Sequence, residues 1–156
     1  MFQWVNPEQT WARREDGTFV PASRIPDGAE IAPYAPPPPS ATDVDTERDR
    51  RMGSFTFGGK SYDLKGQSLA NVSGAGTLSL AAIINGAQPG DLRWADPDND
   101  FSWIANDNTM TPMDAQTCWA FAQTAASHRK AMIFKARQIK DMTPIPSDYS
   151  ADSYWE

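Results

Sequence analysis

The sequence has one cysteine, Cys118, and one histidine, His128, among its 156 residues. A single cysteine excludes a disulfide scaffold within the chain and a zinc site built from several cysteines. Both residues fall in one predicted helix, where ten residues of rise, about 15 Å, keep them too far apart to act as a nucleophile and its base. We therefore expect Cys118 to be a small core residue and His128 to lie on the solvated face or on a partner surface.

The sequence also lacks an apolar run of the roughly twenty residues that cross a bilayer. Met1–Thr10 has no basic region, so we expect no signal peptide. Twenty acidic residues outnumber fourteen basic ones, and the formal net charge of −6 argues against a protein that binds nucleic acid through its bulk charge. These features predict a protein made in a reducing compartment, with no membrane contact and no nucleic-acid partner.

No segment combines the residues that a catalytic or ligand site needs. Asp96–Asp100 imitates the start of a calcium-binding loop, but Phe101 stands where that loop needs glycine. Gly74–Gly76 falls short of a dinucleotide-binding motif, because Ser79 occupies the third glycine position and no strand leads into it. Helical spacing pairs no carboxylates in an apolar setting, as acid–base catalysis requires. The sequence therefore predicts no enzyme, no cofactor, no metal site and no small-molecule substrate.

Proline and charge divide the chain into four segments. Residues 33–39 hold five prolines, which favour polyproline II and cannot join a helix or sheet. Residues 47–142 hold ten acidic and eleven basic residues, so the excess negative charge lies on the two ends. The sequence thus predicts an N-terminal docking arm over 1–32, a proline-rich linker over 33–46, a compact domain over 47–142 and an acidic, aromatic C-terminal tail over 143–156.

Two hairpins are expected in the compact domain. Residues 55–57 and 60–64 alternate apolar and polar side chains around Gly58 and Gly59, which predicts a two-residue turn with Phe57 opposite Lys60. The same register places Phe55 opposite Tyr62. A second pair of short strands, 101–105 and 109–110, flanks an Asn-Asp-Asn turn.

Three helices are expected around these hairpins. A charged helix over 44–52 ends at a glycine, and a second runs from Ser68, as its N-cap, to Asn85. A third helix is predicted over 112–141, with Thr111 as N-cap and an acidic residue in its first turn. The fold class is therefore α+β: two short antiparallel hairpins packed on two helices, preceded by a charged helix and flanked by extended N- and C-terminal arms.

Small residues in the second and third helices predict close packing. Gly74 and Gly76 each cost a helix about 1 kcal/mol relative to alanine, so we expect a neighbouring backbone to approach both. The third helix repeats apolar residues at intervals of three or four, many of them alanine, and its second half is basic. Its predicted apolar stripe consists of Ala115, Cys118, Trp119, Ala122, Ala125, Ala126, Met132, Ile133, Ala136 and Ile139.

Aromatic residues gather on the two predicted arms. Aromatic side chains are costly to leave in water and are favoured anchors at protein interfaces. We predict that they dock on other proteins, although for the side chains of residues 1–32 folding back onto their own domain is an equal alternative. The predicted partner-binding residues are Phe2, Trp4, Trp11, Phe19, Tyr34, Tyr149, Tyr154 and Trp155.

Motifs in residues 47–142 resemble a phage-associated domain family of unassigned function, common in tail-region and tail-fibre-associated genes of bacteriophages and prophages. The N-terminal segment 14–21 also resembles the leader often found upstream of that domain. The resemblance implies a virion or tail-assembly role and no catalytic residues. The matching segments are Glu47–Arg51 before Gly53, Phe55–Asp63, Ala70–Ala75, Phe101–Asn108 with Met113, and Ala136–Asp141.

These observations predict a structural or adaptor component of a phage tail, baseplate or fibre, held to neighbouring virion proteins by its arms. Its expected location is the tail region of the virion, after synthesis in the cytoplasm of the host bacterium. Homo-oligomerisation through the last helix is left open. One alternative is a tail-fibre assembly chaperone that the virion does not retain. Another, a small cell-wall-degrading enzyme, is disfavoured by the missing catalytic site.

Overall fold

The computed structural model describes the whole chain, from Met1 to Glu156, and divides it into two compact units, Met1–Pro38 and Pro39–Glu156. The first helix, α1 (Ala41–Met52), begins directly after this division. The predicted boundary between residues 46 and 47 therefore falls inside α1 and is corrected to the proline run. Ser40 fixes the start of α1, because its hydroxyl accepts from the Asp43 amide while the Asp43 carboxylate accepts from the Ser40 amide at 2.7 Å.

The first unit is a small four-stranded sheet rather than an extended arm. Its strands are β1 (Phe2–Trp4), β2 (Trp11–Arg14), β3 (Phe19–Pro21) and β4 (Ile31–Ala32), in the order β3-β2-β1-β4. The first three strands pair antiparallel, and β4 pairs parallel to β1. Gly17, at φ +86°, closes the turn between β2 and β3, and the cross-strand pair Ala12 and Val20 is buried. The prediction of an extended N-terminal arm is therefore wrong.

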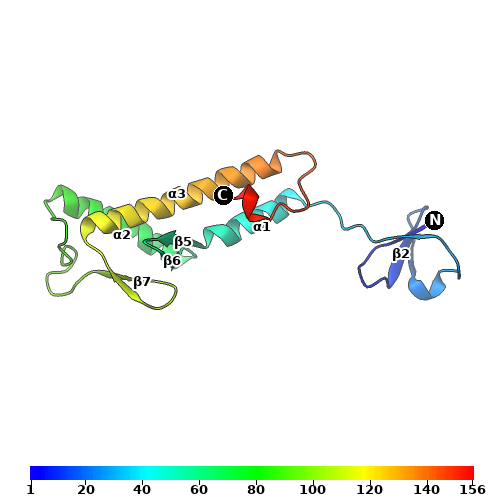
Figure 1. The fold of residues 1–156 in the computed structure, drawn as a ribbon, viewed down its shortest axis with the longest axis horizontal. Coiled ribbons are helices and arrows are strands. Elements are labelled where there is room, and N and C mark those ends of the chain that lie inside the picture. Colours follow the sequence, from blue (N-terminus) through cyan, green and yellow to red (C-terminus); the bar gives the residue numbers. More distant parts are fainter. The chain divides into compact units, whose positions relative to one another are not determined.

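The second unit is built along its longest helix (Figure 1), and its α+β class is confirmed. Helix α2 packs along the first half of α3, and α1 packs along the second half. Both run antiparallel to α3, because Gly76 contacts Ala122 while the later Ala87 contacts Gln116, and Asp45 pairs with Lys140 while the later Arg51 contacts His128. Two hairpins, β5-β6 and β7-β8, complete the unit. The further elements are β5 (Ser54–Phe57), β6 (Lys60–Asp63), α2 (Gln67–Ile84), β7 (Ser102–Ile104), β8 (Met110–Pro112), α3 (Ala115–Lys140) and a 3-10 helix at Asp152–Tyr154.

Phe121 of α3 is the centre of the first core. Its ring centroid lies 4.9 Å from that of Phe55, 4.8 Å from Tyr62, 5.4 Å from Phe57 and 5.1 Å from Trp103. These rings come from both hairpins, so one side chain joins the sheets to the helix. The register of β5 and β6, with Phe55 opposite Tyr62 and Phe57 opposite Lys60, is confirmed. The predicted stripe on α3 omitted Phe121.

Small residues let α2 and α3 approach closely. A Cβ at Gly76 would lie 2.5 Å from the Cβ of Ala122, so only glycine fits there. Gly74 faces open space, and the close approach predicted for it is wrong. Cys118 is buried beside the same contact, 3.7 Å from the carbonyl oxygen of Ala75, as predicted.

The C-terminal segment closes a second core between α1 and α3. Trp155 is only 3% exposed and packs with Val44, Met132 and Ile139. Its indole Nε1 donates to the Tyr149 carbonyl oxygen at 2.8 Å, which holds the segment in a turn. The prediction of an extended C-terminal arm is wrong. The chain is more stable with this large apolar ring buried in the core than with the ring exposed to water.

Arg51 fixes that segment from the α1 side. Its guanidinium lies 5.2 Å from the Trp155 ring, donates to the Ser150 carbonyl oxygen at 2.8 Å and pairs with Asp152 at 2.8 Å. Glu47 accepts from the same guanidinium at 2.6 Å. One arginine thus links α1 to the last turn of the chain.

Two predicted N-caps are wrong. Gly66 precedes α2, and Ser68 lies within its first turn. Residues 110–112 pair with β7, so Thr111 belongs to a strand. Helix α3 begins at Ala115, three residues after its predicted start, with Asp114 as N-cap. The Asp114 carboxylate accepts from the amides of Thr117 and Gly90, both at 2.7 Å. The Thr117 hydrogen bond, followed by that of Gly90, lowers the pKa of Asp114.

Two glycine substitutions on α2 should have opposite effects on the free energy of unfolding. Gly76→Ala forces α2 away from Ala122 and should cost about 1–3 kcal/mol. Gly74→Ala meets no neighbour and should stabilise the chain by about 0.5–1 kcal/mol, because alanine favours the helix. Urea unfolding followed by circular dichroism compares the two variants. Equal effects would contradict the packing of α2 on α3.

The lowered pKa of Asp114 predicts an acid-dependent contribution to stability. The folded pKa lies below the unfolded one, so the contribution is complete above about pH 4 and is lost as the pH falls through the folded value. Asp114→Ala should therefore cost about 1 kcal/mol at pH 7 and progressively less below pH 4. Urea titrations at pH 7, 4 and 3 measure this difference, and a cost that stays constant would refute the assignment.

Candidate protein-interaction site

The first unit brings three of the predicted partner-binding aromatics together. Trp4, Phe19 and Tyr34 line one pocket of about 220 Å³ with Arg13 and Pro37. The Phe19 ring is largely exposed, at 62%. Residues from three strands and from the proline run thus form a small aromatic surface.

The remaining predicted residues lie elsewhere. Phe2 packs under the Arg14 guanidinium, 5.9 Å from its ring centroid, and Trp11 is exposed on β2. The C-terminal aromatics are engaged within the second unit: Trp155 is buried, and the Tyr154 hydroxyl donates to Asp148 at 3.2 Å. The structure therefore does not bring the eight predicted side chains to one site.

Helix α2 carries a feature that the sequence analysis missed. None of its 18 residues is charged, although one side of the helix faces solvent. Leu78 is 64% exposed and Ile84 is 76% exposed, and Leu80, one turn before Ile84, is partly exposed. An exposed helix normally presents charged or polar residues on its outer face, so exposed leucine and isoleucine on a helix without any charge form an accessible apolar surface. The uninterrupted run of uncharged residues from Gln67 was the available signal.

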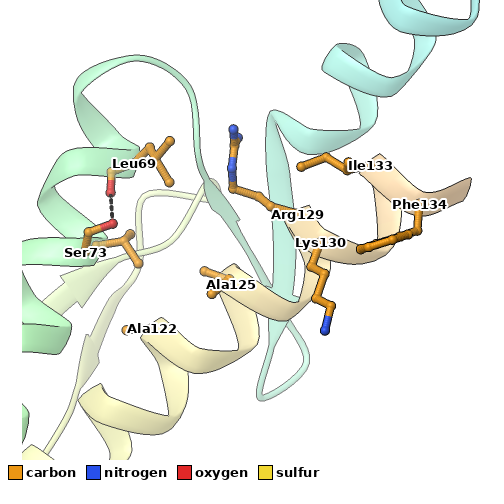
Figure 2. Close-up of a pocket in the computed structure, with 10 residues that line it drawn as sticks. Leu69, Ser73, Ala122, Ala125, Arg129, Lys130, Ile133 and Phe134 are labelled. Atoms are coloured by element: carbon orange, nitrogen blue, oxygen red, sulfur yellow. Dashed lines mark hydrogen bonds between the residues drawn. The ribbon is translucent and has the colours of Figure 1, made fainter. Parts of the chain in front are cut away.

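A groove of about 370 Å³ lies between α3 and the N-terminal half of α2. Figure 2 shows Leu69 and Ser73 of α2 on one side and Ile133 and Phe134 of α3 on the other, with Ala125 of α3 nearby. The alanines of α3 leave the groove open because their side chains are short. Phe134 and Ile133 are about half exposed, at 58% and 48%. The lining is therefore apolar and accessible.

Two cations flank the groove. Arg129 and Lys130 are the only charged residues in its lining, and Figure 2 shows their charged ends pointing apart. Neither takes part in any ion pair of the structure. The other three bases in the second half of α3 have partners: Arg137 pairs with Asp141 at 3.0 Å, Lys140 pairs with Asp45 at 2.7 Å, and Lys135 donates to the Glu156 carbonyl oxygen.

The side chains considered for catalysis lie apart from the groove. Nε2 of His128 lies 2.9 Å from the Arg51 carbonyl oxygen, and burial raises the pKa of the Cys118 thiol, which lowers its thiolate fraction. The Asp96 carboxylate accepts from the Asp98 amide and the Asn99 side chain, as in a polar turn. No cluster of three or more His, Cys, Asp or Glu residues is placed to hold a metal ion. None of the helices combines the length and apolar character that a membrane span requires.

A family model described as "Domain of unknown function (DUF4376)" matches residues 39–153. The match begins at the division between the two units and includes α1, α2, α3 and both hairpins of the second unit. Neither a curated protein nor a solved structure matches the chain.

Two aromatic substitutions should show by their effect on stability which ring lies in the core and which lies on the surface. Trp155→Ala removes a buried ring from the α1–α3 core and should cost about 3–5 kcal/mol of unfolding free energy. Phe19→Ala removes an exposed ring and should change stability by less than about 0.5 kcal/mol. Thermal and urea unfolding of the full chain measures both. Full stability of the Trp155 variant would restore the interpretation of the tail as a free docking segment.

Proposed function

We propose that the chain, which belongs to the family Domain of unknown function (DUF4376), is a non-enzymatic adaptor that joins protein subunits in a bacteriophage tail. The observation that carries the adaptor role is the charge-free outer face of α2, which exposes Leu78 and Ile84 towards its C-terminal end, while an apolar groove runs along its N-terminal half. Such a surface is costly to leave in water and gains stability when a protein covers it.

The separate aromatic pocket of the first unit supports an adaptor rather than a single-site binder. Trp4, Phe19 and Tyr34 offer a second surface of the kind that is enriched at protein interfaces. This pocket lies wholly within residues 1–38, whereas the groove lies wholly within the second unit. Each unit can therefore hold a different subunit.

The bacteriophage tail is proposed from the resemblance of residues 47–142 to domains of tail-associated genes. A tail adaptor needs stable interaction surfaces and no reaction chemistry. The side chains agree with that role, because His128 is engaged with a backbone carbonyl and Cys118 is buried. An assembly chaperone would use similar surfaces but would leave the finished particle.

The experiment that tests the proposal is quantitative mass spectrometry of purified particles from cells that express a tagged copy of the chain. We expect the chain at a fixed ratio to the tail proteins. Its absence from finished particles, together with its presence on tail-fibre intermediates, would overturn the virion role in favour of the chaperone.

A matched pair of substitutions tests the surface that carries the proposal. Ile84→Glu places a charge on the exposed face of α2 and should reduce incorporation into particles at least tenfold, with little change in thermal stability. Gln138→Glu places the same charge on an exposed position of α3 outside the groove and should leave incorporation unchanged. Equal incorporation of both variants would show that the α2 face is not used.

A further inference from the structure

We infer that the groove between α2 and α3 binds an acidic amphipathic helix of a partner protein, which lies beside the two helices and completes a three-helix bundle. This inference rests on the proposed adaptor function and names the chemistry of the partner at one of its surfaces. Four properties of the groove support it: its floor, its walls, its charge and the composition of the two helices.

The floor of the groove suits the close approach of a helix. Ala122, Ala125 and Ala126 follow one another at intervals of three and four residues from Ala122 along α3, so the floor that α3 provides carries only methyl side chains. Helices pack with their axes about 8–10 Å apart, and short side chains allow the lower end of that range. From Ala122 to Phe134 the groove spans about 18 Å of α3, or roughly three turns.

The walls supply apolar contacts on both sides of that floor. Leu69 and Val72 come from α2, and Ile133 and Phe134 come from α3. Recognition of a helix in a groove uses apolar anchors at positions i, i+3, i+4 and i+7 of the bound helix. Three turns of a bound helix provide such a set of anchors, so the length of the groove and its apolar lining both suit a helix.

The charge of the groove selects an acidic partner. Arg129 and Lys130 flank the apolar lining and have no acidic partner within the chain, whereas Arg137 and Lys140 on the same helix are each paired. Carboxylates on either side of the partner's apolar face would pair with these two cations. Complementary charge at the edge of an interface contributes chiefly to specificity and to the rate of association.

The composition of α2 and α3 argues against a second copy of the chain that presents this same face. Neither helix contains an aspartate or a glutamate between its first and last residues. A copy placed face to face would therefore bring no carboxylate to Arg129 or Lys130. A different chain has to supply the acidic residues.

The test uses two synthetic helical peptides of 14 residues with leucine at positions i, i+3, i+4, i+7 and i+11. One peptide carries glutamate at the flanking positions and the other carries lysine. Fluorescence anisotropy with the full chain should show at least tenfold tighter binding of the glutamate peptide, and added salt should weaken it. Equal affinity for both peptides, or no binding of either, would overturn the inference.

Variants locate the peptide on the structure. Ala126→Gln fills the floor of the groove and should weaken binding at least tenfold, whereas Ala131→Gln, the same change at an exposed position of α3 outside the groove, should not. Lys130→Glu should reduce the preference for the glutamate peptide. Binding that Ala126→Gln does not affect would place the peptide elsewhere and refute the site.

Sedimentation velocity tests whether a second copy of the chain, rather than a partner helix, occupies the groove. We expect the chain to remain a monomer at micromolar concentration. A dimer that Ala126→Gln dissociates would assign the groove to a second copy and overturn the inference. If the groove fails to bind the peptide while the chain is still found in particles, the adaptor function stands and only the assignment of its partner is lost.

Discussion

The packing of Phe121 is the interaction on which the second unit depends. This ring contacts aromatic side chains of both hairpins, so it joins elements that are separated by some fifty residues of chain. Short hairpins are marginal alone, and a shared aromatic contact gives both of them a helix to pack on. With the hairpins fixed on one side of α3, an adjoining side of its first half packs on α2 in the same core, and the contact of Gly76 with Ala122 sets how closely α2 approaches. The groove between α2 and α3 results from this packing of the hairpins and α2 on α3.

The second half of α3 is organised differently. Here α1 and the last residues of the chain form a core around Trp155, and Arg51 joins them through its hydrogen bonds and ion pairs. Helix α2 begins at Gln67 and extends along α3 only as far as the region of Arg129. Beyond that point, α3 is covered by α1 but not by α2, and Ile133 and Phe134 stay accessible. The exposed apolar residues thus result from the unequal lengths of the helices.

The sequence patterns predicted those parts of the fold that depend on residues close together in the sequence. The Gly58-Gly59 turn and the alternation around it determine the register of β5 and β6, and the helical spacing of α3 predicted the burial of Cys118. The strands of the first unit contain only two to four residues, too few for alternation to be distinguished from a loop, so its sheet was missed. The N-cap of α3 was misplaced at Thr111 because the second strand of the predicted hairpin continues to Pro112. The burial of Trp155 was missed because the packing of the tail on α1 is set by residues distant in the sequence.

The groove could be predicted only in part. The lack of charge in α2 is visible in the sequence, but the same composition is typical of a fully buried helix. Which of the five bases on α3 stay unpaired depends on the positions of Asp45, Asp141 and the last residue, and only Asp141 is close in sequence. The aromatic pocket of the first unit was predicted as residue types, whereas the convergence of Trp4, Phe19 and Tyr34 required the sheet.

The uncharged composition of α2 also determines how its outer face responds to the surroundings. No side chain from Gln67 to Ile84 gains or loses a proton between acid and alkaline conditions, so the face keeps the same chemistry wherever the fold survives. Contacts made there are insensitive to ionic strength, whereas contacts near Arg129 and Lys130 weaken as counterions screen them. The second unit therefore presents two kinds of binding surface. Contacts to the α2 face keep the same affinity at any salt concentration, whereas contacts near Arg129 and Lys130 weaken as the salt concentration rises.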